Sequence, residues 1–373
     1  MGLDVLLHEV RAVSVADSAA PSSAGSRVPT TLPVTLVVPV KNEVATLPEL
    51  FAALGAALVW PAEIIFTDAG STDGTRELLC RWWTAQKRAG TRLEIIERPG
   101  AFPGGGRNAG IATANAEWIA FLDGGIRPEP DWLLHLHACA IAGGRDHAFG
   151  LCRFDGTGAI PLAVCALTNG VGEMRTVLPA AIFHRSVFER IGLFPDQLRS
   201  AEDLVWLKRF EAAYGQNTKD GAEGSSEVRM RETFGVSKVQ SVQNGNRLVC
   251  DRALVHYTHY PATLIGILRK WFAFEKSSVT AGVGGMGRQV YVAGALVWGI
   301  LTLMVPQAAI AAVAIYILLR GILDPIRRSR SLIWWKAKPV ALLLAPVCAL
   351  CIDAGKLVGA LAGITPPGVV RGL

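Results

Sequence analysis

Short apolar runs alternate with helix-period segments along the first part of the chain. Residues 35–40 (TLVVPV) form a β-branched run that predicts a strand, and residues 47–54 carry leucine and phenylalanine at helical spacing. The same strand–helix order is then repeated. A strand is expected over residues 63–67, followed by a turn rich in glycine, serine and threonine, a helix over 78–83 and a strand over 93–97. This alternation predicts an α/β fold with a mostly parallel, Rossmann-like sheet and helices on both faces.

A third unit of the same kind brings a second carboxylate to the end of a strand. We expect a helix over residues 107–114 and then a strand over 118–122, which ends at Asp123. Asp68 ends an earlier strand in the same way. Ligands of open α/β sheets bind beyond the carboxyl ends of the strands, so Asp68 and Asp123 mark the expected site.

The alternation stops after about residue 150. Residues 215–246 are polar and rich in Gly, Ser, Asn and Gln, which predicts a surface excursion. Residues 263–276 place leucine, isoleucine and aromatic residues on one helical face, with arginine and lysine elsewhere. This segment is either an amphipathic helix in a membrane interface or a helix that closes the soluble core.

The last third of the chain contains two long apolar segments. Residues 290–319 carry no charge, and this run is longer than the roughly 20 residues that span a bilayer. Because Pro306 divides it, the run predicts either one tilted, kinked helix or a tight hairpin. Residues 339–364 are interrupted by Asp353 and Lys356, and the pattern leaves open whether they span the bilayer, dip into it or lie in its interface.

Composition supports this division. The 373 residues are 51% hydrophobic with a mean hydropathy of +0.34, which is high for a soluble enzyme. The net charge is +6, and six arginines and lysines fall in residues 320–338, between the apolar segments. Such a loop favours the cytoplasmic side and anionic lipids, and therefore the hairpin. No basic stripe interleaved with aromatic residues occurs in the first 250 residues, so we expect no nucleic-acid partner.

These patterns divide the chain into four parts. We expect a disordered leader over 1–30, an α/β domain over 31–260, an interfacial amphipathic helix and linker over 261–288, and hydrophobic membrane-anchoring helices over 289–373. Charged residues interrupt the leader, so we expect no signal peptide. Seven scattered cysteines suit a reducing compartment. We therefore expect the α/β domain on the cytoplasmic face of the cell's inner membrane.

Five segments between about Pro33 and Tyr260 carry a family resemblance. They are, in order, VTLVVPVKNE, TDAGSTDGT, GGGRNAGI, FLDGGIRPEPDWL and AEDLVWLKR. In this order the chain resembles the family 2 glycosyltransferases of the GT-A fold, of the membrane-associated type that makes bacterial polysaccharides or lipid-linked glycans. The resemblance implies a GT-A catalytic domain that binds a nucleotide-sugar donor, followed by a C-terminal α-helical membrane region.

The resemblance places the donor against residues of the first four segments, namely Pro39, Asn42, Glu43, Asp68, Arg107, Asn108 and Asp123. Asp68 ends a strand, where it can accept hydrogen bonds from the base or ribose; the alternative is an aspartate that only stabilises its turn. Family members often carry a second aspartate where this chain has Ala69. The glycines at 104–106 allow close backbone approach, and Arg107 brings a cation beside the donor.

A divalent metal ion is the next implication of the resemblance. GT-A enzymes usually hold Mg²⁺ or Mn²⁺ against the diphosphate with a D-x-D motif, whereas this chain reads Asp123-Gly124-Gly125. Hard cations need few protein ligands when phosphates and waters fill the shell. We therefore expect Mg²⁺ or Mn²⁺ with Asp123 and His256 as protein ligands, and His259 as the rival of His256.

Glu202 and Asp203 match the Glu-Asp pair of the family, in which the aspartate is the general base of an inverting displacement. A carboxylate that is ionised at neutral pH can take the proton of the acceptor hydroxyl during attack. The alternative role for this pair is an acidic helix N-terminus that the helix dipole favours.

The sequence thus predicts an inverting glycosyltransferase that moves a sugar from a nucleotide-sugar donor to a lipid-linked or membrane-borne acceptor, in cell-surface polysaccharide or glycolipid biosynthesis. Its expected partners are the donor, the acceptor and membrane lipids. One alternative is a catalytically impaired relative that acts as a binding partner in a polysaccharide assembly complex. A transporter or channel is the last alternative, because the apolar segments are too few to form one alone.

Overall fold

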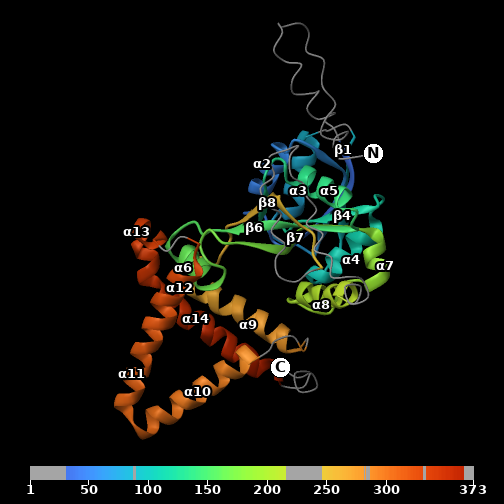
Figure 1. The fold of residues 1–373 in the computed structure, drawn as a ribbon. Helices are drawn as coiled ribbons and strands as arrows, with labels where there is room; N and C mark the ends of the chain where they lie inside the picture. Colours follow the sequence, from blue (N-terminus) through green and yellow to red (C-terminus); the bar gives the residue numbers. More distant parts are fainter. Residues whose placement is uncertain are drawn as a thin grey trace.

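An α/β body carries a helical region at its C-terminal side (Figure 1). The computed structural model describes residues 31–86, 90–215, 246–280, 282, 286–330 and 333–364. The expected leader over 1–30 and nearly all of the expected polar excursion lie outside the described residues.

One eight-stranded sheet forms the centre of the described body, in the order β3-β2-β1-β4-β7-β6-β8-β5. Its strands are β1 (Thr31–Val40), β2 (Trp60–Asp68), β3 (Arg92–Glu97), β4 (Trp118–Phe121), β5 (Ile126–Pro128), β6 (His147–Phe154), β7 (Met174–His184) and β8 (Val249–Tyr257). The half formed by β3, β2, β1 and β4 is parallel, as is the β6–β8 pair. β7 runs antiparallel to β4 and β6, and β5 antiparallel to β8. The predicted mostly parallel sheet is confirmed.

The strand register brings the ends of the parallel strands to one edge. Val40 of β1 pairs with Asp68 of β2, and Asp68 pairs with Glu97 of β3. β4 ends at Phe121, so Asp123 follows two residues beyond the strand. The carboxylates of Asp68 and Asp123 therefore follow strands that end at the same edge, as the alternation predicted.

Helices cover both faces of the sheet because buried side chains alternate along its strands. Leu36 and Val38 of β1 belong to the core that includes side chains of α2, α3 and α5. Val37, between them, belongs to a second core with side chains of α4, α7 and α8. The helices are α2 (Leu47–Gly55), α3 (Thr75–Gln86), α4 (Pro103–Thr113), α5 (Trp132–Ala142), α6 (Ala159–Thr168), α7 (Arg185–Ile191) and α8 (Glu202–Gly215).

The C-terminal region consists of helices that pack on the body at one end. They are α9 (Leu264–Thr280), α10 (Met286–Met304), α11 (Pro306–Tyr316), the π-helix η1 (Ile317–Leu323), α12 (Asp324–Arg328), α13 (Trp334–Ala337) and α14 (Pro339–Ile364). α14 crosses α9 closely, because Gly355 and Gly359 have no side chain where the α9 backbone passes. α14 also contacts α6 of the α/β body.

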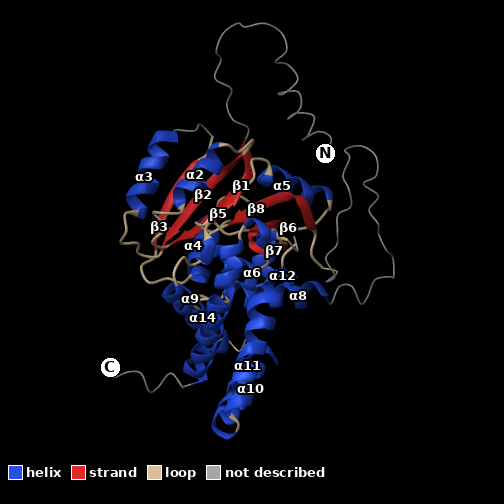
Figure 2. Ribbon diagram, turned by 90° about the vertical axis from the view of Figure 1, so that its left-hand side faces the viewer, coloured by secondary structure: helices blue, strands red, loops and turns tan. Residues whose placement is uncertain are grey.

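The apolar run over 290–319 is broken into two helices. α10 ends at Met304 and α11 begins at Pro306, because proline cannot continue the hydrogen-bond ladder of the preceding helix. Figures 1 and 2 show α10 and α11 projecting away from the body, at the end farthest from α2 and α3. Leu303 and Met304 at the turn are 87% and 77% exposed. The run therefore forms a bent pair of helices and not one continuous helix.

Two helices in the described part of the chain are long and apolar enough to cross a membrane, Gln307–Arg328 and Pro339–Ile364. Much of their surface is not covered by protein. This agrees with the C-terminal α-helical membrane region expected from the sequence.

Close packing of α4 on β1 predicts a specific destabilisation. A Cβ atom added at Gly110 would lie 2.3 Å from Val37 Cγ1. We expect Gly110→Ala to lower the free energy of unfolding by about 1–3 kcal/mol, the usual cost of overpacking a core. Denaturant unfolding of the detergent-purified protein measures this. Gly55→Ala is the matched control, because an added Cβ there meets nothing within 4 Å, and it should cause no loss. Equal stability of the two variants would contradict the close packing.

Candidate active site

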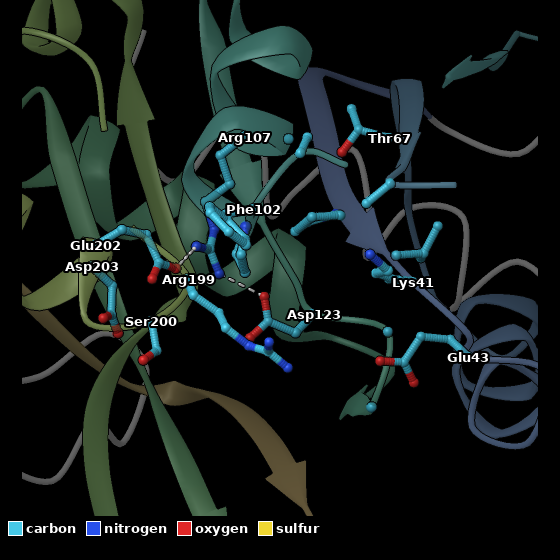
Figure 3. A pocket seen from close by; sticks show the side chains of 18 of the residues that line it. Lys41, Glu43, Thr67, Phe102, Arg107, Asp123, Arg199, Ser200, Glu202 and Asp203 are labelled. Carbon is cyan, nitrogen blue, oxygen red and sulfur yellow. Dashed lines mark hydrogen bonds and ion pairs between the residues drawn. The ribbon is translucent and has the colours of Figure 1, made fainter. Parts of the chain in front are cut away.

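A cavity of about 630 Å³ lies beyond the carboxyl ends of β1, β2 and β4 (Figure 3). Residues after these strands line one side, among them Lys41, Ala69 and Asp123. The start of α4, the start of α8 and α9 complete the lining. The pocket is therefore where the sheet pattern placed the expected site.

Hydrogen bonds between the loops after β1 and β2 build one wall of this pocket. The amide N–H of Asn42 donates to Ser71 Oγ at 2.9 Å, and Asn42 Oδ1 accepts from the Thr72 amide at 2.8 Å. Asn42 has a φ of 56°, a conformation that asparagine tolerates better than most residues. Asp73 accepts from both the amide and the hydroxyl of Thr75, and these bonds lower its pKa. Asn42, predicted as a donor-binding residue, thus uses its backbone amide and its side-chain oxygen to join the loops.

Asp68 is buried at the end of β2. Its Oδ1 accepts from the amide of Ser71 at 2.9 Å and from the Ser71 hydroxyl at 2.6 Å. This is the turn-stabilising arrangement that the sequence left open as the alternative role. Ala69, the next residue, lines the pocket. Contact of Asp68 with a donor stays a prediction.

Arg107 joins three elements at the base of the pocket. Its guanidinium is buried and donates to Asp123 Oδ1 at 2.7 Å and to Glu202 Oε1 at 2.6 Å (Figure 3). Burial by itself lowers the pKa of Arg107, but the carboxylates of Asp123, Glu202 and Asp203 outweigh it and raise the pKa above its usual value. Arg107 is therefore a permanent cation that fixes α4, the segment after β4 and α8 together.

Asn108, the next residue on α4, has a structural contact. Its side-chain amide donates to the Phe194 carbonyl at 2.8 Å, and its Oδ1 accepts from the Phe194 amide at 3.0 Å. Both groups of this predicted donor-binding side chain are thus paired with one backbone unit. Pro39, by contrast, lines the pocket as predicted from the resemblance.

Glu43 reaches the pocket beside Asp123. It accepts from the Thr46 hydroxyl, and a Cβ atom added at Gly124 would lie 3.1 Å from Glu43 Cγ. Burial raises the pKa of Glu43, the Thr46 bond lowers it, and repulsion from Asp123 raises it further. The absence of a side chain at Gly124 therefore allows two carboxylates to approach each other.

The structure separates the two candidate histidines. His256 Nε2 lies 2.5 Å from Glu129 Oε1, and His256 is not among the residues that line the pocket. Successive residues of a strand point to opposite faces, so Tyr257 lines the pocket and His256 on β8 does not. His259 lines the pocket, and a Cβ atom added at Gly125 would lie 3.2 Å from its ring. His259, which the sequence offered as the alternative ligand to His256, therefore occupies the space that a side chain at Gly125 would fill.

Glu202 and Asp203 begin α8 at the pocket wall. Glu202 is buried and bonded to Arg107, whereas Asp203 Oδ1 accepts only from the next amide, that of Leu204, at 2.8 Å among the bonds of the described residues. Burial raises the pKa of Asp203, Arg107 lowers it, and Asp123 raises it. The two acids thus have different surroundings, with Glu202 fixed in an ion pair and Asp203 available to a ligand.

Ala201, directly before this pair, has a strained backbone. Its φ is 68°, a left-handed conformation that costs a residue with a Cβ atom about 1–2 kcal/mol. Its carbonyl accepts the first helical bond of α8, from the Val205 amide at 3.0 Å. The strain therefore lies at the residue that sets the direction of Glu202 and Asp203.

Sequence reasoning missed three cations of the pocket, Lys41, Arg98 and Arg199. Lys41 lies inside the first motif, where its position after a strand was a usable signal. Arg98 and Arg199 lie in loops whose course only the folded chain determines. Together with Arg107 they place four basic side chains around the cavity, a suitable surrounding for a phosphorylated ligand.

Part of the chain is similar to known glycosyltransferases. Residues 35–159 match the family described as Glycosyl transferase family 2. This part of the chain is therefore similar to family 2 glycosyltransferases. It is also 29% identical over 188 residues to the glycosyltransferase AglE of Haloferax volcanii, over 47% of this chain and 60% of that protein. The chain thus matches less than two thirds of the length of this curated relative.

Solved structures similar to this chain include a mannosyltransferase and S. aureus TarS. The mannosyltransferase PcManGT from Pyrobaculum calidifontis, in complex with GDP-Man and Mn²⁺, has a TM-score of 0.43 and 16% identity, over 97% of this chain and 98% of that one. S. aureus TarS 1-349 in complex with UDP has a TM-score of 0.39 and 16% identity, over 88% of both chains. The family match over residues 35–159 agrees with the glycosyltransferase class expected from the motifs.

The buried ion pair between Arg107 and Glu202 predicts a non-additive pair of mutations. Arg107→Met leaves the Glu202 carboxylate buried without its partner, so we expect the free energy of unfolding to fall by about 3–5 kcal/mol. Arg107→Met combined with Glu202→Met should recover most of this loss, because replacing both partners by apolar side chains is often neutral. Denaturant unfolding of the single and double variants measures the difference. A double variant less stable than Arg107→Met would contradict a strong coupling of the pair.

Proposed function

We propose that the chain transfers a sugar, with inversion, from a nucleotide-sugar donor to a lipid-linked or membrane-borne acceptor in cell-surface polysaccharide or glycolipid biosynthesis. The observation that carries the proposal is the cavity itself. It combines an available carboxylate, Asp203, with basic side chains at the carboxyl ends of parallel strands. A family 2 domain over residues 35–159 supplies the reaction class.

The cations of the pocket support binding of a nucleoside diphosphate. Lys41, Arg98 and Arg199 line the cavity, and Arg107 is already neutralised by its two carboxylate partners. A departing nucleoside diphosphate gains negative charge in the transition state, and preorganised cations stabilise that charge. We assign this role first to Lys41, Arg98 and Arg199, and we assign to Arg107 the positioning of Asp123.

Asp203 is proposed as the general base. It takes the proton of the acceptor hydroxyl while that oxygen attacks the anomeric carbon and the bond to the diphosphate breaks on the opposite face. Burial raises the pKa of Asp203, which makes it a stronger base than an exposed aspartate. Glu202 cannot share this role while its carboxylate is paired with Arg107.

A divalent ion fits this pocket only with the help of the donor. Among the described residues, no group of three or more His, Cys, Asp or Glu side chains is arranged to hold a metal ion. Asp123 keeps one carboxylate oxygen outside its bond to Arg107, and its side chain is 42% exposed. We propose that Asp123 and His259, in place of His256, bind Mg²⁺ or Mn²⁺ whose other ligands are phosphate oxygens and water. Such an ion, held by Asp123 and His259, would supply positive charge beside the leaving diphosphate.

A membrane-borne acceptor is supported by the helical region. The Arg320 guanidinium donates to the Leu167 carbonyl at 3.1 Å, and the Arg330 amide donates to the Val171 carbonyl at 3.1 Å. These contacts hold η1 and the segment after α12 against the α/β body, which supports a placement of both on the same side of a membrane. We therefore propose that α10 and α11 enter and return as a hairpin, that membrane lipids contact them, and that the α/β body is cytoplasmic.

Removing the base should separate chemistry from binding. We expect Asp203→Asn to lower kcat by about 100-fold or more while the Kd for the donor changes by less than about twofold. Transfer assays and calorimetry measure the two quantities. Asp155→Asn is the matched control, because Asp155 Oδ1 also accepts the next backbone amide, at 2.8 Å, but lies outside the pocket. Parallel loss of kcat and donor affinity in Asp203→Asn would overturn the base assignment.

The metal assignment predicts a difference between the two histidines. We expect EDTA to weaken donor binding by about tenfold or more, because the uncompensated diphosphate then faces Asp123 and Glu43. His259→Ala should weaken binding of Mn²⁺ in the presence of donor, and His256→Ala should not. Calorimetry with Mn²⁺ or EDTA tests both statements. Undiminished donor binding in EDTA would contradict the metal assignment. The positive charge that meets the diphosphate would then come from the basic side chains alone.

A further inference from the structure

A hydroxyl group on α9 holds the backbone that precedes the proposed base. The amide of Ser200 donates to Ser277 Oγ at 3.1 Å, and the Ser277 hydroxyl donates to the Ser200 carbonyl at 2.7 Å. Ser277 is 7% exposed, so water competes little for these bonds. We call this pair of bonds the Ser277 clamp. One side chain thus satisfies both backbone groups of Ser200.

The clamp lies next to the strained residue of the site. Ser200 is followed by Ala201, which has a φ of 68° and is 2% exposed. Such a conformation persists in a residue with a Cβ atom only where surrounding contacts hold it. The Val205 amide holds the carbonyl of Ala201 on one side, and the clamp fixes the preceding residue on the other. Release of the clamp would allow Ala201 to return to negative φ and turn the start of α8.

The same helix contributes to the pocket and packs against the C-terminal region. Phe274 lines the cavity one helical turn before Ser277, so both lie on the face of α9 that looks toward the site. On another side, α9 contacts α14 through Gly355 and Gly359. α14 therefore holds α9 on the side away from the pocket, and this packing sets the position of Ser277.

We propose that Ser277 is a positioning residue, which keeps Ala201 in the left-handed conformation that directs Asp203 into the pocket. The inference rests on the proposed transfer reaction, in which Asp203 is the base. Ser277 touches neither donor nor acceptor in this role and acts through the backbone of Ser200. It therefore governs how often Asp203 has the productive direction, and so it affects kcat and not donor affinity.

Five variants of the whole chain test the proposal, one of them Ala201→Gly alone, which is the reference for the double variant below. Ser277→Ala removes the clamp, and Ser277→Thr keeps a hydroxyl at the same position. Ser278→Ala is the matched control, because Ser278 is also buried and its hydroxyl has no hydrogen-bond partner among the described residues. Ala201→Gly combined with Ser277→Ala removes the cost of positive φ, so it makes the clamp unnecessary.

We expect Ser277→Ala to lower kcat by about tenfold or more with donor Kd changed less than about twofold, since a displacement of about 1 Å can cost about 100-fold. Ser277→Thr should retain most of the activity, and Ser278→Ala should retain all of it. In the Ala201→Gly background, Ser277→Ala should cost less than about threefold, because glycine adopts positive φ freely. A loss of the same size in that background would overturn the proposal, and so would equal activity of Ser277→Ala and Ser278→Ala.

Hydrogen exchange separates this inference from the proposed function. The Ser200 amide donates to Ser277 Oγ, so Ser277→Ala should speed its exchange whether or not a donor is turned over. If the wild-type protein transfers no sugar from any donor, the proposed function fails while exchange at Ser200 still reports the clamp. If transfer is normal but exchange and kcat are both unchanged in Ser277→Ala, only the positioning role fails.

Discussion

The arrangement of the site depends on one buried cation. Arg107 is inside the protein only because Asp123 and Glu202 both accept its hydrogen bonds, and a buried charge without such partners would be very costly. These partners come from elements far apart in sequence, the segment after β4 and the start of α8. The parallel half of the sheet and the more mixed half therefore meet at a guanidinium. Arg107 pairs with Glu202 and not with the neighbouring Asp203, so Asp203 has no ion-pair partner among the described contacts.

Close approach around this cation requires glycine at particular positions. An added Cβ at Gly106 would meet Thr67 Oγ1 at 2.8 Å, and one at Gly104 would meet the Pro195 carbonyl oxygen at 2.3 Å. The glycine-rich segment thus has a packing role in addition to any approach to a ligand. Without side chains at these positions, α4 packs close enough to β1 and β2 for Arg107 to contact both Asp123 and Glu202. The same principle acts at Gly124 and Gly125, where Glu43 and His259 occupy the space beside Asp123.

The C-terminal helices are joined to the α/β body by hydrogen bonds and also help to form the pocket. Arg320 contacts Asp324, Asp353 and the Leu167 carbonyl, which joins η1, α12 and α14 to α6 of the α/β body. α9 lies between α14 and the pocket. A helix that forms a pocket wall is thereby held by the region we propose to enter the membrane. The position of the base and the attachment to lipid are consequently linked through packed side chains.

The sequence alone determined the strand–helix alternation, the edge that carries Asp123, the resemblance to family 2 glycosyltransferases and the apolar C-terminal region. Each of these depends on local periodicity or on the order of motifs. The sequence could not show that His259 lines the pocket and His256 does not, because this depends on which face of β8 carries His256 and on where the chain runs after β8 ends at Tyr257. It also did not find the clamp between Ser277 and Ser200. That contact joins residues 77 positions apart. No local sequence pattern at either residue indicates the other as its partner, and only the tertiary structure brings the two groups within hydrogen-bonding distance.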